Sequence, residues 1–311
     1  MNNAATVRKT FPLAPADAPQ QTWEITAEVI RLINPAYDFS VLQRTFDDVM
    51  RLFDGEYPGY RAIETLYHDR SHTLEVYVCA VRLMHGVHVS VQHMDDETIT
   101  MFCIAALMHD IGYAQRIEEA EGTGAQHTGI HIERGIEFIR QYLAENDLPQ
   151  PWNKTFSCVL RTTSPERIID TIHFHDQRSR LLGQMLGTAD LVAQMADRIY
   201  LEKVLLLFLE FKEANFGNYS SMFDLLCKTH GFHEYTMVKL REDFGGIYAR
   251  LADHFKKVLG VDKNYYMEAI DKNLEYLSKV IASGEDNYQA MLRRHGITEK
   301  ANRILLAATN G

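Results

Sequence analysis

Hydrophobic residues recur at helical spacing along most of this chain. Apolar positions three and four residues apart are separated by short polar or glycine-containing breaks, and few stretches alternate strictly as strands do. All eight prolines lie at or before residue 165, so no proline interrupts a helix from residue 166 to the end of the sequence. The pattern predicts helices over residues 22–33, 40–53, 59–66, 70–85, 95–110, 128–145, 153–162, 166–176, 179–213, 220–229, 234–258, 264–283 and 286–294.

Several of these predicted helices have recognisable ends. Asp95 and Asp96 precede an apolar run and are typical helix caps. The segment 164–166, Ser-Pro-Glu, is typical of a helix start with proline in the first turn. Gly112 and Gly260 are expected helix stops. Together these signals predict an all-α fold.

The chain divides into three predicted parts. Residues 1–20 include three prolines in PLAPADAPQQ, which favours an extended, flexible leader. We expect residues 21–260 to form one helical domain and residues 261–311 to form a C-terminal helical extension packed on it.

Composition narrows the class of protein. With 311 residues, 46% of them hydrophobic, the chain can bury a large core, which excludes a small stapled scaffold and extensive disorder. The net charge is −10 and the basic residues are dispersed, which argues against a nucleic-acid polymer as partner. The longest apolar runs are too short for a membrane helix, the N-terminus lacks a signal-peptide core, and four dispersed cysteines indicate free thiols. We therefore expect a cytoplasmic protein with no membrane association.

Three segments carry residue types suited to metal chemistry. In the first, Tyr67 to Thr73, His68 and His72 are four residues apart and share one face of a helix. One imidazole can then bind a metal while the other faces a substrate. The alternative is two surface histidines at the start of an amphipathic helix.

The second segment places His109 and Asp110 directly after the apolar run 101–108. A helix that is apolar on all faces is buried, and a buried carboxylate is costly unless it is neutralised. A divalent cation would neutralise it. The alternatives are an ion pair with an arginine or a helix cap.

The third segment surrounds Asp190. Asp190, Gln194 and Asp197 follow one another at helical spacing and form a polar line beside an apolar stripe. A solvated helix edge explains Asp197 well. It explains Asp190 less well, because the small residues 187–189 before it indicate that another element packs closely there.

Two weaker groups follow the same logic. His127, His131 and Arg134 share a helix face after the flexible segment 121–126 and are candidates for a phosphate or a second metal. His173, His175 and Asp176, at the end of a predicted helix, are similar candidates. The remaining histidines are interpreted as surface residues: His85, His88, His93, His230, His233, His254 and His295.

The order His, His-Asp, Asp on helices resembles the HD superfamily of metal-dependent phosphohydrolases. Tyr67 to Thr73 resembles the signature of the cyclic-nucleotide phosphodiesterases, and Ala189-Asp190-Leu191 resembles the segment with their last metal ligand. His109 to Gly112 is more similar to the bacterial phosphohydrolase branch. The similarity spans about residues 60 to 200.

The resemblance implies an HD-domain helical bundle with additional C-terminal helices. It implies that His72, His109, Asp110 and Asp190 bind one divalent ion, with Asp110 bridging to a second. The ions would be Fe, Mn, Zn or Mg. His68 would match the general acid, and His131 would match a further histidine for the second metal or the phosphate.

The match to the phosphodiesterases is incomplete. Asp69 stands where their signature has asparagine, and the glutamine and phenylalanine that clamp a purine are not found in this sequence. We keep Asp69 and Gln194 as pocket candidates. The substrate stays open among a cyclic nucleotide, a nucleoside phosphate and another ester.

We therefore expect a hydrolase acting on a small nucleotide or phosphorylated metabolite. One alternative is an HD-type ligand-binding or signalling module without turnover, and another is a purely structural helical protein without metal. Retention of His68 beside the four ligand candidates favours catalysis. Glu210 and Glu213, further along the chain, suit either a pocket rim or a homo-oligomer interface.

Overall fold

The computed structural model describes residues 18–119 and 121–310, with side chains described as far as residue 307. Most of the predicted leader therefore lies outside the described residues. Within them the chain forms no strand, and its only extended pairing is an isolated bridge between Tyr60 and Arg116. The all-α prediction is confirmed. The α-helices are α2 (Pro19–Ile33), α3 (Ser40–Asp54), α4 (Arg70–Ser90), α5 (Asp96–Leu107), α6 (His131–Glu145), α7 (Trp152–Leu160), α8 (Gln177–Ala196), α9 (Tyr200–Glu213), α10 (Met222–Arg241), α11 (Arg250–Leu259), α12 (Tyr265–Ala282), α13 (Tyr288–Met291) and α14 (Ile297–Asn310).

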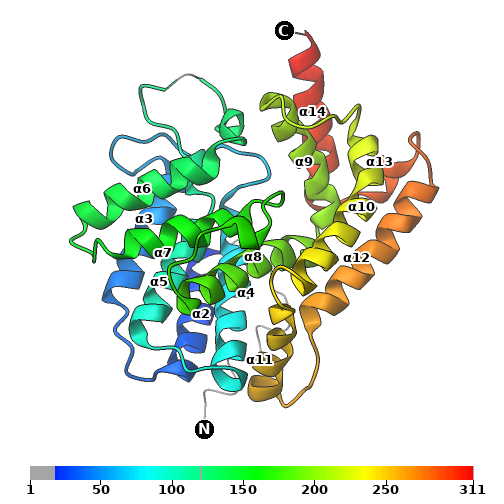
Figure 1. Ribbon diagram of the computed structural model, residues 1–311. Coiled ribbons are helices and arrows are strands. Elements are labelled where there is room, and N and C mark those ends of the chain that lie inside the picture. Colours follow the sequence, from blue (N-terminus) through cyan, green and yellow to red (C-terminus); the bar gives the residue numbers. More distant parts are fainter. Residues whose placement is uncertain (1–17, 120, 311) are drawn as a thin grey trace.

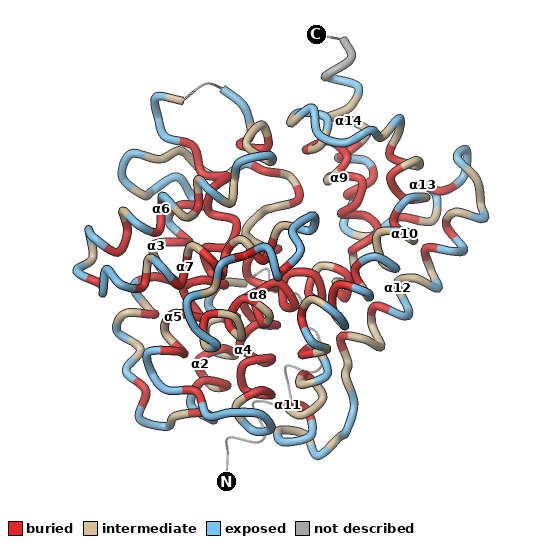
Figure 2. Tube along the Cα trace, viewed as in Figure 1, coloured by how far each residue is buried: buried red, intermediate tan, exposed pale blue. Residues whose placement is uncertain are grey.

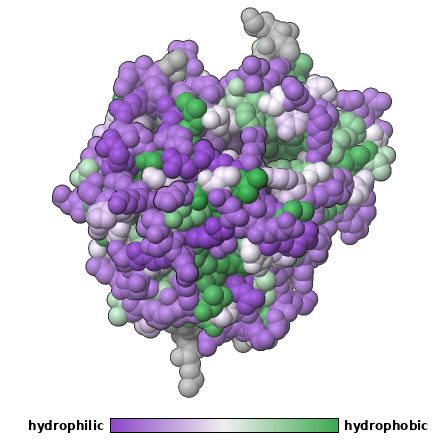
Figure 3. All heavy atoms as spheres, viewed as in Figure 1, coloured by the Kyte–Doolittle hydropathy of each residue, from purple (hydrophilic) through white to green (hydrophobic). Residues whose placement is uncertain are grey.

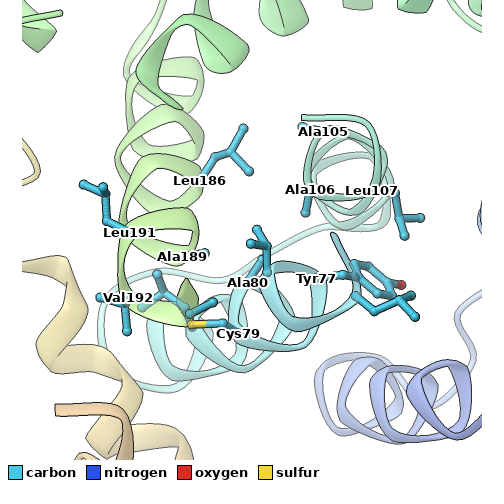
Figure 4. Close-up of a cluster of buried hydrophobic side chains, with 14 of the residues drawn as sticks. Tyr77, Cys79, Ala80, Ala105, Ala106, Leu107, Leu186, Ala189, Leu191 and Val192 are labelled. Atoms are coloured by element: carbon cyan, nitrogen blue, oxygen red, sulfur yellow. The ribbon is translucent and has the colours of Figure 1, made fainter. Parts of the chain in front are cut away.

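Helices α4 and α8 form the centre of the molecule. α4 packs against α2, α5, α8 and α11, while α8 packs against α4, α7 and α12. Figure 4 shows small side chains such as Ala80, Ala106 and Ala189 where α4, α5 and α8 approach one another. A helix that is buried on nearly every face needs apolar residues all round, as α4 and α5 have. Figure 2 shows burial concentrated along these inner helices and exposure along the outer ones.

Helices α9, α10, α12, α13 and α14 form a second group on one side of this centre (Figure 1). α12 packs against α8, and α14 packs against α9. On the face shown in Figure 3, polar residues cover most of the surface, with smaller hydrophobic patches near the centre and toward α9 and α10. None of the described helices has the length and apolar content that a membrane span requires. The division into domain and extension stays a prediction.

The helix predicted over residues 179–213 is in fact two helices, α8 and α9, joined at a corner. The side chain of Asp197 accepts a hydrogen bond from the backbone N–H of Ile199 at 3.0 Å. Asn273 of α12 donates to the carbonyls of Met195 and Asp197 at 2.9 and 2.8 Å. These hydrogen bonds provide partners for backbone N–H and C=O groups at the corner. The chain can therefore turn there without leaving these polar groups unpaired.

Other helix predictions also need correction. Residues 59–66 are not helical, and in 166–176 only a short 3₁₀ turn, Ile169–Thr171, forms. The break placed between residues 229 and 234 lies instead after α10, where Gly245 and Gly246 adopt left-handed φ values of 62° and 68°. The predicted helix 286–294 shrinks to α13, and α14 was not predicted. The cap at Asp95 and the stop at Gly260 are confirmed.

Candidate metal centre

Four buried side chains meet where α4, α5 and α8 come together. His72 lies in the first turn of α4, His109 and Asp110 follow the end of α5, and Asp190 lies in the middle of α8. The apolar run of α5 carries the His-Asp pair into the interior, which is why both side chains are buried. The structure thus brings together the four residues that the three sequence segments singled out.

The nitrogen and oxygen atoms of this group face one another at short distances. The Nε2 atoms of His72 and His109 are 3.4 Å apart and lie 3.3 and 3.1 Å from Oδ2 of Asp110. Oδ1 of Asp190 lies 3.5 Å from Nε2 of His72 and 3.9 Å from Nε2 of His109. His72, His109 and Asp110 form a group that could hold a metal ion.

The chemistry of these donors fits a divalent cation. Metal–ligand bonds of about 2.1 Å place neighbouring donor atoms about 3.0–3.4 Å apart, close to the spacing seen here. Nδ1 of His109 lies 2.9 Å from the carbonyl of Ala106 and must donate its proton there. The lone pair of Nε2 is then directed at the other donors, as a metal-binding imidazole requires.

The charges of the group also favour a bound cation. Burial disfavours a charged His72, but its hydrogen bonds to Asp110 and Asp190 outweigh burial and raise its pKa to about 10. Burial likewise opposes a charged Asp110, yet His109 beside it holds the pKa of that carboxyl well below its usual range. The buried carboxylates thus attract positive charge, which protons or a divalent ion can supply.

Gly112 allows the turn that follows His109 and Asp110 to pack against α6. A Cβ atom on Gly112 would lie 1.8 Å from the carbonyl oxygen of His131 and 2.7 Å from the amide nitrogen of Gly135. Gly112 was predicted as a helix stop, but α5 already ends at Leu107. The glycine instead permits close contact between the 3₁₀ turn Ile111–Tyr113 and the start of α6.

His131 stands on the other side of Asp110. Its Nε2 lies 3.7 Å from Oδ1 of Asp110, the oxygen that does not face His72 and His109. Its Nδ1 lies 2.7 Å from the carbonyl of Thr128, so Nε2 again carries the lone pair. Burial lowers the pKa of His131 and favours its neutral form. The two oxygens of Asp110 therefore face two separate sets of nitrogen atoms.

Tyr113 supports two of these histidines. Its ring stacks on His68 and on His131, with centroid distances of 4.7 and 4.6 Å. The two imidazole centroids are 6.3 Å apart. Two rings stacked on opposite faces of the phenol would be about 7 Å apart or more, so both imidazoles lie on the same side.

His68 is held by a buried glutamate from α9. Nδ1 of His68 lies 2.6 Å from Oε2 of Glu210, while Oε1 accepts hydrogen bonds from the backbone N–H groups of Tyr67 and His68 at 2.6 and 3.1 Å. Burial lowers the pKa of His68, but the charge of Glu210 outweighs it and the net shift is upward. Glu210 was predicted only as a rim or interface residue. A carboxylate within the apolar run 204–211 was the signal that it is buried and paired.

The two pocket candidates have structural partners. Asp69 caps α4 by accepting hydrogen bonds from the backbone N–H of His72 at 2.9 Å and from the hydroxyl of Ser71 at 2.8 Å. Gln194 accepts a hydrogen bond from the hydroxyl of Tyr67 at 2.8 Å and donates to the carbonyl of Asp190 at 3.3 Å. Both residues therefore order segments that carry the central group.

Arg134 and His127 both lie against Glu119 in the loop before α6. The guanidinium of Arg134 binds the carboxylate of Glu119 and the carbonyls of Gly112 and Ala114 at 2.7–3.0 Å. Nε2 of His127 lies 3.9 Å from Oε1 of Glu119. Since protein acceptors occupy Arg134, it holds the loop before α6, and its role toward a phosphate stays a prediction.

Other histidine interpretations need correction. His85 and His254 are not surface residues: they are 1% and 3% exposed, and their Nδ1 atoms are 3.1 Å apart between α4 and α11. Their chain spacing gave no sign of this pairing. Asp176 lies not at the end of a helix but at the start of α8, which it caps through Ser179, and His173 and His175 beside it are exposed.

A comparison with known protein families identifies the type of domain that contains the four central residues. The family model of the HD domain matches residues 70–202, so the chain carries an HD domain and the resemblance seen in its sequence is confirmed. HD domains bind divalent metals, and their superfamily consists generally of metal-dependent phosphohydrolases. The matched range contains the four central residues but neither His68 nor Glu210. Neither the curated proteins nor the solved structures gave a significant match to the chain.

Proposed function

We propose that this protein is a metal-dependent phosphoric ester hydrolase that acts on a small nucleotide or phosphorylated metabolite. The observation that carries the proposal is the pair formed by His68, which is partly exposed, and buried Glu210 beside the four ligand candidates. A module that only binds a ligand needs no proton donor beside its metal ligands. The HD domain supports the reaction class, and the pair supports turnover.

The central residues supply the donors that the reaction requires. His72, His109, Asp110 and Asp190 would hold one divalent ion, and Asp110 with His131 would contribute to a second. Bound divalent ions supply Lewis acidity, which activates water and neutralises charge on phosphoryl oxygens. The buried position of the four side chains keeps bulk water from weakening their charges.

His68 would protonate the leaving oxygen of the substrate. Glu210 accepts the Nδ1 proton, so the proton on Nε2 is the one available for transfer. The charge of the carboxylate also favours the protonated form of His68, because it raises the pKa of the imidazole against the opposing effect of burial. General acid catalysis of this kind contributes about 10²–10⁴-fold to the rate.

Metal analysis and a panel of phosphodiesters and phosphomonoesters test the proposal. A His68→Asn variant should keep its metal and lose about 10²–10⁴-fold in turnover. The loss should be greatest for alkyl esters and small for nitrophenyl esters, whose leaving groups depart without protonation. Equal turnover by wild type and variant on alkyl esters would remove His68 from the mechanism.

An Asp110→Ala variant tests the ligand assignment separately. It should lose bound metal together with activity, because Asp110 faces both sets of nitrogen atoms. Full metal occupancy in this variant would refute the assignment. Wild-type protein that binds metal but hydrolyses no ester would instead indicate a ligand-binding or signalling module, and a protein that binds no metal would be structural.

A further inference from the structure

A buried ion cluster lies behind the metal ligands and plays no part in the chemistry proposed so far. Nζ of Lys203, in the first turn of α9, lies 3.1 Å from Oε2 of Glu75 and 2.7 Å from Oδ2 of Asp197. The side chains of Lys203, Glu75 and Asp197 are only 8%, 16% and 8% exposed. Charges so far from water are retained only when each is closely paired.

The cluster links the helices that carry two of the ligand candidates. Glu75 lies three residues after His72 on α4, about one helical turn away on the same face. Asp197 ends α8 seven residues after Asp190, about two turns further along the same face. One lysine side chain therefore connects the helix of His72 to the helix of Asp190.

Other hydrogen bonds also hold the end of α8. Asn273 binds its last carbonyls, and the Asp197 side chain binds the amide of Ile199. These contacts hold the corner to α12 and α9 but not to α4. Lys203 adds an ion pair with α4 to the direct packing of α4 on α8. It also separates two carboxylates that would repel each other across the helix interface.

We infer that Lys203 is a positioning residue for the metal centre, which through Glu75 and Asp197 sets the distance between His72 and Asp190. The inference rests on the proposed function in that the centre binds a divalent ion. Loss of the Lys203 side chain should weaken metal binding, because ligands displaced by a fraction of an ångström no longer complete the coordination sphere. Residues that orient metal ligands typically contribute about 10–100-fold to metal affinity.

Titration with Co²⁺, followed by its visible absorption and by calorimetry, tests the inference on the full-length protein. Lys203→Met and Glu75→Ala should each weaken Co²⁺ binding by about 10–100-fold. Glu75→Gln should bind nearly as the wild type does, because its amide oxygen still accepts the lysine hydrogen bond. Lys239→Met is the matched control: Lys239 is also buried and lies 3.3 Å from Asp243, but on α10. It should lower the unfolding temperature and leave Co²⁺ affinity unchanged.

Whether Co²⁺ affinity rises or falls in each variant distinguishes a positioning role from a direct effect of charge on the bound ion. Removing a positive charge near a cation site would by itself tighten Co²⁺ binding, whereas removing a negative charge would weaken it. Co²⁺ affinity in Lys203→Met at or above that of wild type would overturn the inference. So would equal weakening in Glu75→Gln and Glu75→Ala, a comparison that decides the matter even if Lys203→Met fails to fold.

The same titration distinguishes this inference from the proposed function. Wild-type protein that binds Co²⁺ but hydrolyses no ester would overturn the proposed function and leave the role of Lys203 standing. A wild type that hydrolyses esters while all Glu75 and Lys203 variants bind Co²⁺ equally well would overturn the role of Lys203 alone. A wild type that binds no divalent ion would overturn both.

Discussion

The buried pair of His85 and His254 should make the fold sensitive to mild acid. The groups that act on their charge are basic: His88 and Lys257 near His85, and Arg82 and His85 near His254. Burial, reinforced by these neighbours, lowers the pKa of His85 to about 4 and that of His254 well below its usual value. The folded chain therefore keeps both rings neutral under conditions in which the unfolded chain takes up protons.

The size of the effect follows from the shift at His85. Its ordinary pKa is 6.5 and its folded value is about 4. As the pH falls below 6.5, protons bind the unfolded state first, so the free energy of unfolding decreases until the folded ring also titrates near pH 4. Between pH 7 and pH 5 this one group should remove about 2 kcal/mol of stability.

Urea denaturation of wild type and a His85→Gln variant at pH 7 and pH 5 measures this contribution. The amide introduced by the substitution can still donate a hydrogen bond to His254, but it does not titrate. The loss of stability between the two pH values should be about 2 kcal/mol smaller in the variant. If wild type and variant lose equal stability on acidification, His85 is not held neutral in the folded protein and the reasoning fails.

Three further predictions concern the centre itself. Glu210→Gln should lower turnover of alkyl esters about 10²-fold or more, since an amide no longer supports a protonated His68; an unchanged pH–rate profile would contradict this. Tyr113→Leu should reduce kcat about 10- to 100-fold by freeing the histidines that it supports, while Tyr113→Phe keeps the stack and should match wild type. Gly112→Ala should lower the free energy of unfolding, measured in urea, by about 1–3 kcal/mol or more, because its Cβ would meet the carbonyl of His131 at 1.8 Å.

Local patterns in the sequence were sufficient for the fold class and for the central ligand candidates. Helical periodicity and the position of prolines depend on neighbouring residues, so they predict helices without knowledge of the packing. Asp110 and Asp190 stood out because their neighbours indicate burial, and a buried polar group needs a partner. His72 stood out by its spacing of four residues from His68, which places both imidazoles on one helix face.

The partners themselves depended on the tertiary structure. Glu210 meets His68 across 142 residues of chain, and Lys203 meets Glu75 across 128. His85 and His254 are paired across 169 residues, although neither lies in a motif. Periodicity shows which side of a helix is buried but not which helix covers it, and the corner between α8 and α9 depends on bonds from Asn273. Residue type and spacing therefore determined which groups need a counter-charge, while helix packing decided which residue provides it.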